Sequence, residues 1–423
     1  MRWRAGPLRS RNFQLFLACD VVSMAGTSIA AVAVPFAVLS IHGSGSDVGY
    51  VATAALLPMI IFLLLGGVIA DRLPRHQVMV AADLLQGTAQ AASAVVLLTG
   101  TARVWELLVL AALRGTGLGF YFPASTGLLP QTVPDGDRSQ AVAIDRLGDN
   151  GASIAGTALG GILVAAAGPG WGLAADAASF FVAAALRAGM RLPARPPATA
   201  STSVLRELHE GWREFASRRW LWSIVLQFAG VVAVTNALIS VLGPVVADRS
   251  LGGARSWGFI LAAYAVGSVI GGLVMIRFRP SRMLLAATFG VLVFPLLTFA
   301  LAVPLAVPLI IATAFVVGAA GELFSVNWVT TMQQEIPPAA LSRVSAYDAL
   351  GSFALAPVGT VVAGPLLAVF GPGAVLDAGG VLILVVTLLV FAVPEVRQLR
   401  RVPAPAPPAP APPAPAPPAP APG

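Results

Sequence analysis

The sequence contains no lysine, one cysteine and three histidines, and only 11% of its 423 residues are charged. Soluble domains carry about 25% charged residues, so this composition does not supply an ordinary water-exposed surface. Cys19 alone allows neither an intrachain disulfide nor a cysteine-based metal cluster. His42, His76 and His209 fall in three different expected loops, so no catalytic or metal-ligand cluster is visible. We therefore expect no cofactor, no metal and no catalytic residue.

Apolar residues dominate the chain, which is 57% hydrophobic with a mean hydropathy of +0.83. Apolar runs of about 20 residues recur along almost the whole length, and each is long enough to cross about 30 Å of hydrocarbon. We therefore expect an all-α membrane protein with twelve transmembrane helices. Six are predicted before a polar stretch, at 12–40, 47–70, 76–99, 104–128, 139–166 and 171–190. Six more are predicted after it, at 219–246, 255–277, 282–302, 305–332, 341–368 and 373–393.

The basic residues, all 26 of them arginines, are distributed unevenly over the loops. By this assignment 21 lie at the termini and in alternate loops, whereas Arg103, Arg249 and Arg255 lie in the opposite loops. Arg114 and Arg146 fall inside expected helices. Positive residues favour the cytoplasmic side, so we expect both termini in the cytoplasm. The expected location of the chain is the inner membrane of a bacterium. Arginines spread over many short loops form no clustered basic face, so no nucleic-acid partner is expected.

The second half of the chain repeats the first. VPDGDRSQAVAIDRLG (133–148) aligns without a gap with IPPAALSRVSAYDALG (336–351), and Asp145 pairs with Asp348. Duplicated halves with the same orientation are related by an axis along the membrane normal and can enclose a pathway, which predicts two pseudo-symmetric six-helix bundles. A purely structural duplication is the alternative. The expected domains are a bundle at 1–190, a linker at 191–218, a bundle at 219–396 and a tail at 397–423.

The linker and the tail differ from the bundles in composition. The linker contains SVLRELHEGWREFASRR, in which Leu205, Leu208, Trp212 and Phe215 share one helical face, so we expect an amphipathic helix in the cytoplasmic interface. A calmodulin-target or lipid-sensor role is the alternative. The tail repeats PAPAP units, which favour an extended polyproline II form and cannot build a core, so we expect a disordered cytoplasmic tail. Docking of SH3-like partners is its alternative role.

The end of the second expected helix reads GGVIADRLPRH (66–76). It resembles the signature loop of the major facilitator superfamily, G-x-x-x-D-R-x-G-R-R/K, with Pro74 in place of the usual glycine. The matching residues are Gly67, Asp71, Arg72, Arg75 and His76. Three further segments, GLGFYFPASTGLLPQTVP (117–134), LADAASFFVAAALR (173–187) and LRELHEGWREF (205–215), resemble the drug-exporter branch with its macrolide-efflux and siderophore-exporter members. The resemblance covers nearly all of the chain up to the tail and implies export driven by proton antiport.

The fifth expected helix carries GTALGG (156–161), which is similar to an antiporter motif, G-P-x-x-G-G, with Thr157 in place of the proline. Gly156, Gly160 and Gly161 form its packing motif. Small residues allow helices to approach closely and to seal one side of a pathway. Ordinary close packing of neighbouring helices is the alternative.

Ionisable residues within the spans are candidate sites, because a charge at the bilayer centre costs about 2.5 to 3.5 kcal/mol unless it faces a cavity or a partner. The candidates for proton coupling are Asp20, Arg114, Asp149 and Glu322. In the superfamily, helices 1, 4, 7 and 10 line the central cavity, so the resemblance singles out Asp20, Arg114 and Glu322. A permanent structural ion pair between helices is the alternative.

Other polar residues receive different expected roles. Near the cytoplasmic ends we expect a gating motif of salt bridges, comprising Gly67, Asp71, Arg72, Arg75, Asp83, Asp145, Arg146 and Asp348. Candidates to line a substrate cavity are Tyr121, Asn236, Tyr264, Asn327 and Trp328, because they offer hydrogen bonds and stacking among apolar walls. Simple packing is the alternative for each of them.

These patterns together predict a transporter and not an enzyme. We expect a monomer in the lipid bilayer that exports a small hydrophobic or amphipathic compound, such as a drug, an antibiotic, a siderophore or a metabolite, in exchange for protons. An importer of the same fold is an alternative, because direction depends on gradients and coupling. A non-transporting membrane receptor or scaffold is another, although the short loops leave no room for a large soluble sensor domain.

Overall fold

The computed structural model describes residues 6–190, 211–278, 280–303 and 305–401. Every regular element in these ranges is helical, and they contain eleven helices long and apolar enough to cross a membrane. The expected all-α membrane architecture is therefore confirmed for this part of the chain. Expected features within 191–210 and 402–423, namely most of the linker and nearly all of the tail, lie outside the described residues.

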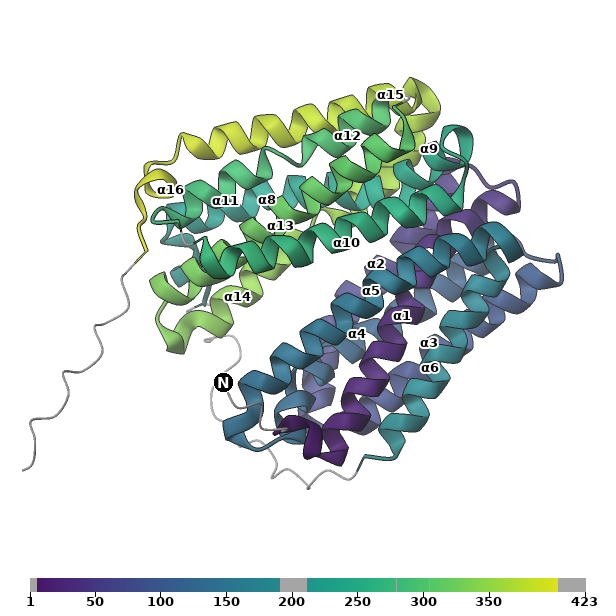
Figure 1. Cartoon of the computed structure of the whole chain (residues 1–423), viewed down its shortest axis with the longest axis horizontal. Helices are drawn as coiled ribbons and strands as arrows, with labels where there is room; N and C mark the ends of the chain where they lie inside the picture. Colours follow the sequence, from purple (N-terminus) through teal and green to yellow (C-terminus); the bar gives the residue numbers. More distant parts are fainter. Residues whose placement is uncertain (1–5, 191–210, 279, 304, 402–423) are drawn as a thin grey trace, which may run out of the picture.

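The first bundle contains six long helices (Figure 1). They are α1 (Arg11–Ser40), α2 (Gly45–Arg72), α3 (Arg75–Leu98), α4 (Val104–Thr132), α5 (Arg138–Ala167) and α6 (Pro169–Ala188), with short 3₁₀ turns η1 (Pro7–Arg9) and η2 (Asp135–Asp137). Local chemistry sets their ends. Ser10 accepts a hydrogen bond from the Phe13 backbone N–H at 3.3 Å and caps α1. Gly168 adopts a φ of 92°, which glycine reaches without strain, and Pro169 then starts α6.

The second bundle has more interruptions. Its elements are α8 (Arg219–Ala237), the π-helical turn η3 (Leu238–Leu242), α9 (Gly243–Ser250), α10 (Ala254–Arg277), α11 (Met283–Val291), α12 (Pro295–Ala302), α13 (Val307–Glu335), α14 (Pro338–Phe353), α15 (Ala356–Phe391) and α16 (Pro394–Gln398). Prolines follow several of the breaks, because proline lacks the N–H that continues the helical ladder. Pro244, Pro295 and Pro357 each stand in the first turn after such a break.

The helix α15 contains a second kind of break. Gly371 has a φ of 78° and a ψ of 164°, which no helix accommodates, and Pro372 follows it. The pair Gly371-Pro372 occupies the same place in the repeat as Gly168-Pro169 between α5 and α6. The element labelled α15 therefore consists of two helical segments that meet at Gly371.

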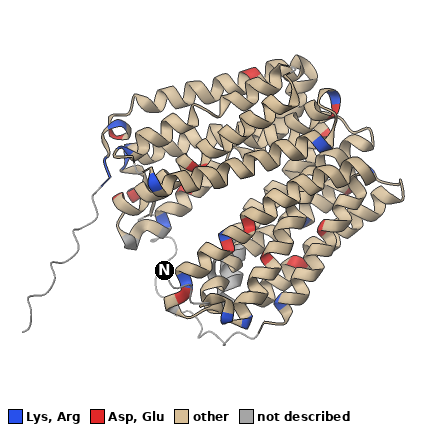
Figure 2. Ribbon diagram, in the orientation of Figure 1, with Lys and Arg blue, Asp and Glu red and all other residues tan. Residues whose placement is uncertain are grey.

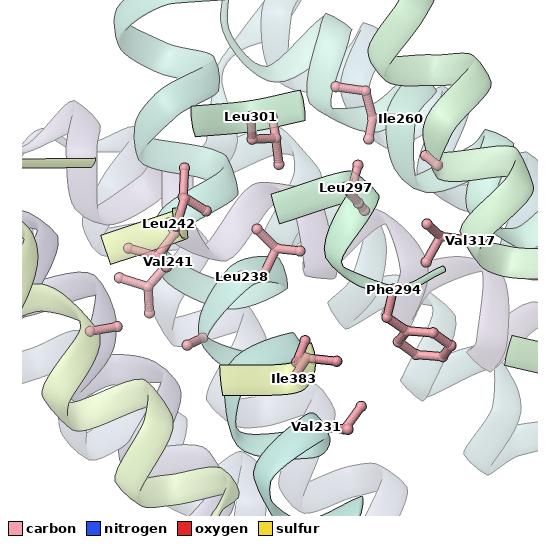
Figure 3. Packing of buried hydrophobic residues seen from close by; sticks show 14 of the residues in the cluster. Val231, Leu238, Val241, Leu242, Ile260, Phe294, Leu297, Leu301, Val317 and Ile383 are labelled. Atoms are coloured by element: carbon pink, nitrogen blue, oxygen red, sulfur yellow. The ribbon is translucent and has the colours of Figure 1, made fainter. Parts of the chain in front are cut away.

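Apolar side chains fill the inside of the bundles and also cover much of their outside. In the second bundle, Leu238 and Leu242 of η3 pack with Leu297 and Leu301 of α12 and with Ile383 of α15 (Figure 3). Large apolar residues also point outward: Val369 is 74% exposed and Leu226 is 65% exposed. Because helices satisfy their own backbone hydrogen bonds, this apolar exterior suits a hydrocarbon surrounding.

The two bundles touch through glycines and small polar residues at one end of the molecule. A methyl group placed on Gly258 of α10 would lie 2.7 Å from the Cα of Gly161 of α5, so the two backbones are in direct contact. On the other side, the Thr53 Oγ1 of α2 lies 2.7 Å from the Thr360 Oγ1 of α15. We call this end, marked by Gly161, Gly258, Thr53 and Thr360, the closed end.

At the opposite end, called the open end, the bundles lie apart and both described termini are found (Figure 1). Gly6 lies beside the Asp137 side chain in the turn before α5. The Arg401 backbone N–H donates to the Ser281 carbonyl between α10 and α11 at 2.8 Å. Both termini therefore lie against loops of the open end.

The described end of the linker packs on the second bundle. Residues 211–216 are helical, and the Trp212 ring lies 5.6 Å from the Tyr347 ring of α14, measured between centroids. The Phe215 ring lies 6.0 Å from the same tyrosine ring. Trp212 and Phe215, which were expected on one apolar face, therefore both contact protein at the open end.

The closed-end contact generates a prediction. Thr53→Cys combined with Thr360→Cys, in a chain that carries Cys19→Ser, should form a disulfide on mild oxidation because the two hydroxyl oxygens are 2.7 Å apart. The measurement is the gel mobility, with and without reductant, of protein cleaved at a protease site inserted between the bundles. The single variants serve as controls. Fragments that separate without reductant would contradict the contact.

Candidate functional site

Charged residues are sparse along the helices and more frequent near helix ends (Figure 2). Several of those within the first bundle line one cavity of about 500 Å³, which receives side chains from α1, α3, α4, α5 and α6. Its charged lining residues are Asp20, Arg114, Asp145, Arg146 and Asp149. The first bundle thus holds acids and bases together in a single cavity.

A buried arginine organises one wall of this cavity. The Arg187 guanidinium of α6 is fully buried and pairs with Asp83 of α3 and with Asp20 of α1. It also donates to the Tyr121 hydroxyl of α4 at 2.7 Å, and that hydroxyl donates to Asp20 Oδ1 at 3.0 Å. A buried cation is stable only when it is paired and hydrogen-bonded. We call these four residues the Arg187 cluster, and it joins α1, α3, α4 and α6.

The Arg187 cluster changes the interpretation of three residues. Arg187 was counted among the 21 arginines of the termini and loops, but it lies inside the bundle because two carboxylates compensate its charge. Asp83, an expected gating residue, is fully buried in the cluster. Tyr121, an expected cavity residue, does line the cavity, but its hydroxyl is occupied by Arg187 and Asp20.

A second polar group lies deeper in the first bundle. Asp176 of α6 is fully buried, and its Oδ2 accepts a hydrogen bond from Gln90 Nε2 at 2.5 Å and lies 3.9 Å from Arg114 Nε. Arg114 also lines a second cavity of about 220 Å³, which is shared with Asn236 and Ser240 of the other bundle. Arg114 therefore lies where the cavity of the first bundle approaches the closed end.

The second bundle has its own cavity, of about 430 Å³, lined by acids and aromatic rings. Glu322 of α13 and Asp348 of α14 are its charged lining residues among those described. Asp348 accepts hydrogen bonds from Trp328 Nε1 at 3.0 Å and from Ser352 Oγ at 3.3 Å. The Phe228 and Phe324 rings stack with centroids 4.4 Å apart. We call this the acid–aromatic cavity.

Electrostatics connects the two halves. Arg146 of α5 lies close enough for its charge to act on Glu322 of the other bundle, and also on Asp145 and Asp149 of its own helix. Asp149 and Glu322 each line a cavity, and neither makes an ion pair with another described residue. Asp149 and Glu322 therefore line the cavities of different bundles, and the charge of Arg146 acts on both.

The remaining predicted cavity residues divide into two groups. Asn236, Tyr264 and Trp328 line the acid–aromatic cavity. Asn327 does not, because its side chain is fully buried: its Nδ2 donates to the Leu323 carbonyl at 2.8 Å and lies 4.0 Å from Met275 Sδ of α10. The structure thus places Asn327 in the packing between α13 and α10.

The structure places the matching acids of the repeat in the two cavities and the signature loop between α2 and α3. Asp145 and Asp348 are aligned with each other in the internal repeat, and each lines the cavity of its own bundle. Gly67, Asp71 and Arg72 lie in the last turns of α2, where only the backbone is described, and Arg75 begins α3.

The glycines of the fifth-helix motif make two kinds of contact. A methyl group on Gly156 would lie 2.5 Å from the Ala25 carbonyl oxygen, and one on Gly160 would lie 2.9 Å from the Ile29 Cα, so both glycines face α1. Gly161 faces Gly258 of α10 in the other bundle. The motif therefore combines packing within a bundle with closure between the bundles.

A further cavity of about 560 Å³ lies against α8, α12 and both segments of α15. Thr298 is its polar lining side chain, and no charged side chain among the described residues lines it. It therefore differs from the two cavities that contain carboxylates. Within the described ranges, no group of three His, Cys, Asp or Glu side chains is placed to hold a metal ion.

Sequence reasoning missed three residues of this site, namely Gln90, Asp176 and Arg187. Asp176 is an ionisable residue in the middle of a span, so the rule that selected Asp20 and Glu322 applies to it equally. Arg187 stands one residue before the end of α6, where an arginine ordinarily reaches water, so its burial has no local signal. Gln90 carries no charge and has no sequence signal of its own.

The Arg187 cluster predicts a large stability effect. Arg187→Met should destabilise the protein by about 3–5 kcal/mol, because removing one partner of a buried pair leaves the other charge uncompensated. The measurement is the midpoint of thermal unfolding in detergent, followed by tryptophan fluorescence. Arg249→Met, at an exposed position at the end of α9, is the matched control. Equal midpoints for the two variants would show that the cluster does not hold the bundle together.

Comparison with known proteins gives relatives that cover more than nine tenths of the chain. The chain is 28% identical over 407 residues to the multidrug efflux pump Tap of Mycolicibacterium fortuitum, covering 91% of this chain and 96% of the relative. It is 27% identical over 401 residues to the enterobactin exporter EntS of Escherichia coli O1:K1 / APEC, covering 92% and 94%. These relatives are transporters and not enzymes.

Solved structures with the same fold are also transporters. The nucleoside transporter NupG superposes with a TM-score of 0.72 at 13% identity, covering 90% of this chain and 98% of that one. A bacterial homologue of the human lysosomal transporter Spinster, in an inward-facing and unoccupied conformation, gives 0.69 at 17% identity, covering 94% and 99%. The model of a family described as transmembrane secretion effectors matches residues 4–309. The chain is therefore a multi-pass membrane transporter that belongs to the transmembrane secretion effector family of the major facilitator superfamily.

Proposed function

We propose that this chain exports a small hydrophobic or amphipathic compound from the bacterial cytoplasm by proton antiport. The observation that carries the proposal is a cavity in each bundle, each with a carboxylate that lacks a described ion-pair partner, in two bundles whose described helices touch at the closed end. The relatives named as an efflux pump and as an exporter support the outward direction. An importer of the same fold is the rival, because coupling and gradients set direction.

The proposal includes twelve membrane crossings. The span Arg343–Phe391 has 49 residues and would be about 74 Å long as one straight helix, more than twice the thickness of the hydrocarbon. The break at Gly371 supports two crossings there, which raises the count from eleven to twelve. An even count puts both termini on one side, and the arginine distribution favours the cytoplasm for that side. The open end would then face the cytoplasm, ready to receive substrate.

Alternating access follows from this geometry. The closed end is held by glycine contacts between α5 and α10 and by a threonine contact between α2 and α15. Among these contacts the threonine pair forms a single hydrogen bond, so little hydrogen bonding is lost when the end opens. Rocking of the bundles would open this end and bring Arg146 toward Glu322 at the other. Asp145, Arg146 and Asp348, with the signature-loop residues Asp71, Arg72 and Arg75, are the proposed gating residues of the cytoplasmic side.

Proton coupling is assigned to the cavity carboxylates. Asp149 and Glu322 have no described ion-pair partner, so their protonation breaks no salt bridge among the described residues. Asp20 is bound by Arg187, so a proton reaches it only when the cluster rearranges. Arg114, held near Asp176, lies on the route toward the closed end. We propose Glu322 and Asp149 as the direct carriers, with Asp20 and Arg114 as linked groups.

The proposed function is tested by measuring the transport of a compound across a membrane under an imposed pH gradient. A drug-susceptibility panel in a hypersensitive host first selects a compound to which the chain confers resistance. Uptake of that compound into inverted membrane vesicles should require an acidic interior and should stop when an ionophore collapses the pH gradient, because export and proton entry are coupled. Uptake that is indifferent to the gradient would overturn proton antiport, and reversed dependence would favour the importer.

The carboxylates are tested separately. Glu322→Gln and Asp20→Asn should each reduce gradient-driven flux by about 100-fold or more, since an amide cannot release the coupled proton. Size-exclusion chromatography checks that the variants remain folded. Asp377→Asn, which removes a charge from an exposed position of α15 outside the cavities, should keep wild-type flux. Full flux in both cavity variants would remove these residues from the mechanism.

A further inference from the structure

We infer that the acid–aromatic cavity binds the positively charged group of an aromatic, amphipathic cation, so that this transporter selects cationic over neutral and anionic substrates. The inference rests on the proposed transport function and names its substrate class. It depends on three observations about one cavity: its charge, its rings and the state of its two carboxylates.

The first observation is the negative charge of the side chains that line the acid–aromatic cavity. Glu322 and Asp348 come from different helices, α13 and α14, and no arginine is among the described side chains that line the cavity. The cavity of the first bundle differs, because Arg114 and Arg146 offset its three acids in part. Two carboxylates in a cavity with a mainly apolar lining attract a cation and repel an anion more strongly than they would in water. The charge of the acid–aromatic cavity therefore selects a cation.

The second observation is the arrangement of aromatic rings. Phe228 of α8 stacks on Phe324 of α13 with an interplanar angle of 6°, and Trp328, one helical turn further along α13, stacks on Phe324 at 6.1 Å and 13°. These three rings form a nearly parallel row in the wall that also holds Glu322. Aromatic faces attract cations and stack with flat apolar groups. Tyr264 and Phe294 add further rings to the lining.

The third observation is the unequal state of the two acids. Asp348 is held by Trp328 Nε1 and by Ser352 Oγ, so its carboxylate is fixed next to the row of rings. Glu322 makes no hydrogen bond with a described residue, and the positive charge that acts on it is that of Arg146 in the other bundle. Glu322 is therefore the carboxylate available to a ligand, and Asp348 is the fixed second charge. A bound cation would replace Arg146 as the counter-charge of Glu322.

Size agrees with this assignment. The volume of about 430 Å³ lies within the range of roughly 300–1,000 Å³ that holds a drug-sized molecule. The apolar lining, including Ile224, Val231 and Val232, would take the uncharged body of such a molecule. The alternative is that the two acids serve only as a gate for Arg146, in which case they would not distinguish cations from neutral compounds.

The test uses equilibrium binding to the purified full chain in detergent, without any gradient. Radiolabelled tetraphenylphosphonium, a permanent aromatic cation, is compared with triphenylphosphine oxide, a neutral compound with a similar aryl body. We expect the wild type to bind the cation about tenfold or more tightly than the neutral compound. Glu322→Gln should weaken cation binding about tenfold and leave binding of the neutral compound unchanged.

Matched variants separate charge from structure. Glu322→Asp keeps the charge and should keep most of the preference for the cation, whereas Asp348→Asn should reduce it. Trp328→Leu should weaken binding of both compounds, because the ring contacts both. Asp377→Asn, outside the cavity in the same bundle, should bind like the wild type. Each variant is checked by size-exclusion chromatography.

Equal binding of the two compounds by the wild type, or unchanged cation binding in Glu322→Gln, would overturn the inference. Either result leaves the proposed export function standing, since flux of another substrate is measured independently. Conversely, flux that ignores the pH gradient, together with the expected binding pattern, would overturn proton antiport and leave the cation site in place. The two failures are therefore distinguishable.

Discussion

Hydrocarbon cannot solvate an ion, and this constraint decides where almost every charged side chain inside the spans is found. Each such group must have a partner or a cavity. Arg187 has partners, with Asp20, Asp83 and Tyr121 around it, and this arrangement ties four helices together. Glu322 and Asp149 have cavities instead. The same cost thus produces a rigid structural cluster in one place and groups available for chemistry in another.

The contact between the bundles follows from a second consequence of the lipid environment. Without a hydrophobic driving force between helices, association depends on close packing, so glycine at an interface gives contact over backbone atoms. Gly161 and Gly258 meet in this way, and Thr53 and Thr360 add one hydrogen bond. Such an interface holds few polar bonds that must break when it opens. It can therefore close one end of the molecule without locking it.

The two halves of the internal repeat share the same helix arrangement, but different side chains line their cavities. Asp145 and Asp348 occupy matching positions, and Gly168-Pro169 and Gly371-Pro372 break the chain at matching points. The cavities nevertheless differ: the first mixes acids with arginines, and the second combines acids with stacked rings. The asymmetry between the halves, and not their likeness, is what can give the transporter its substrate preference.

The sequence by itself determined the apolar spans, the helix boundaries near glycine–proline pairs, the repeat and the family, because hydropathy, backbone restriction and motif spacing are local properties. Tertiary structure alone decided which charges meet. Arg187 looks like a loop arginine until α1 and α3 bring Asp20 and Asp83 to it, and Asn327 looks like a cavity residue until its amide turns toward α10. Pairing depends on helix rotation and contact across more than a hundred residues of sequence, which no local pattern encodes.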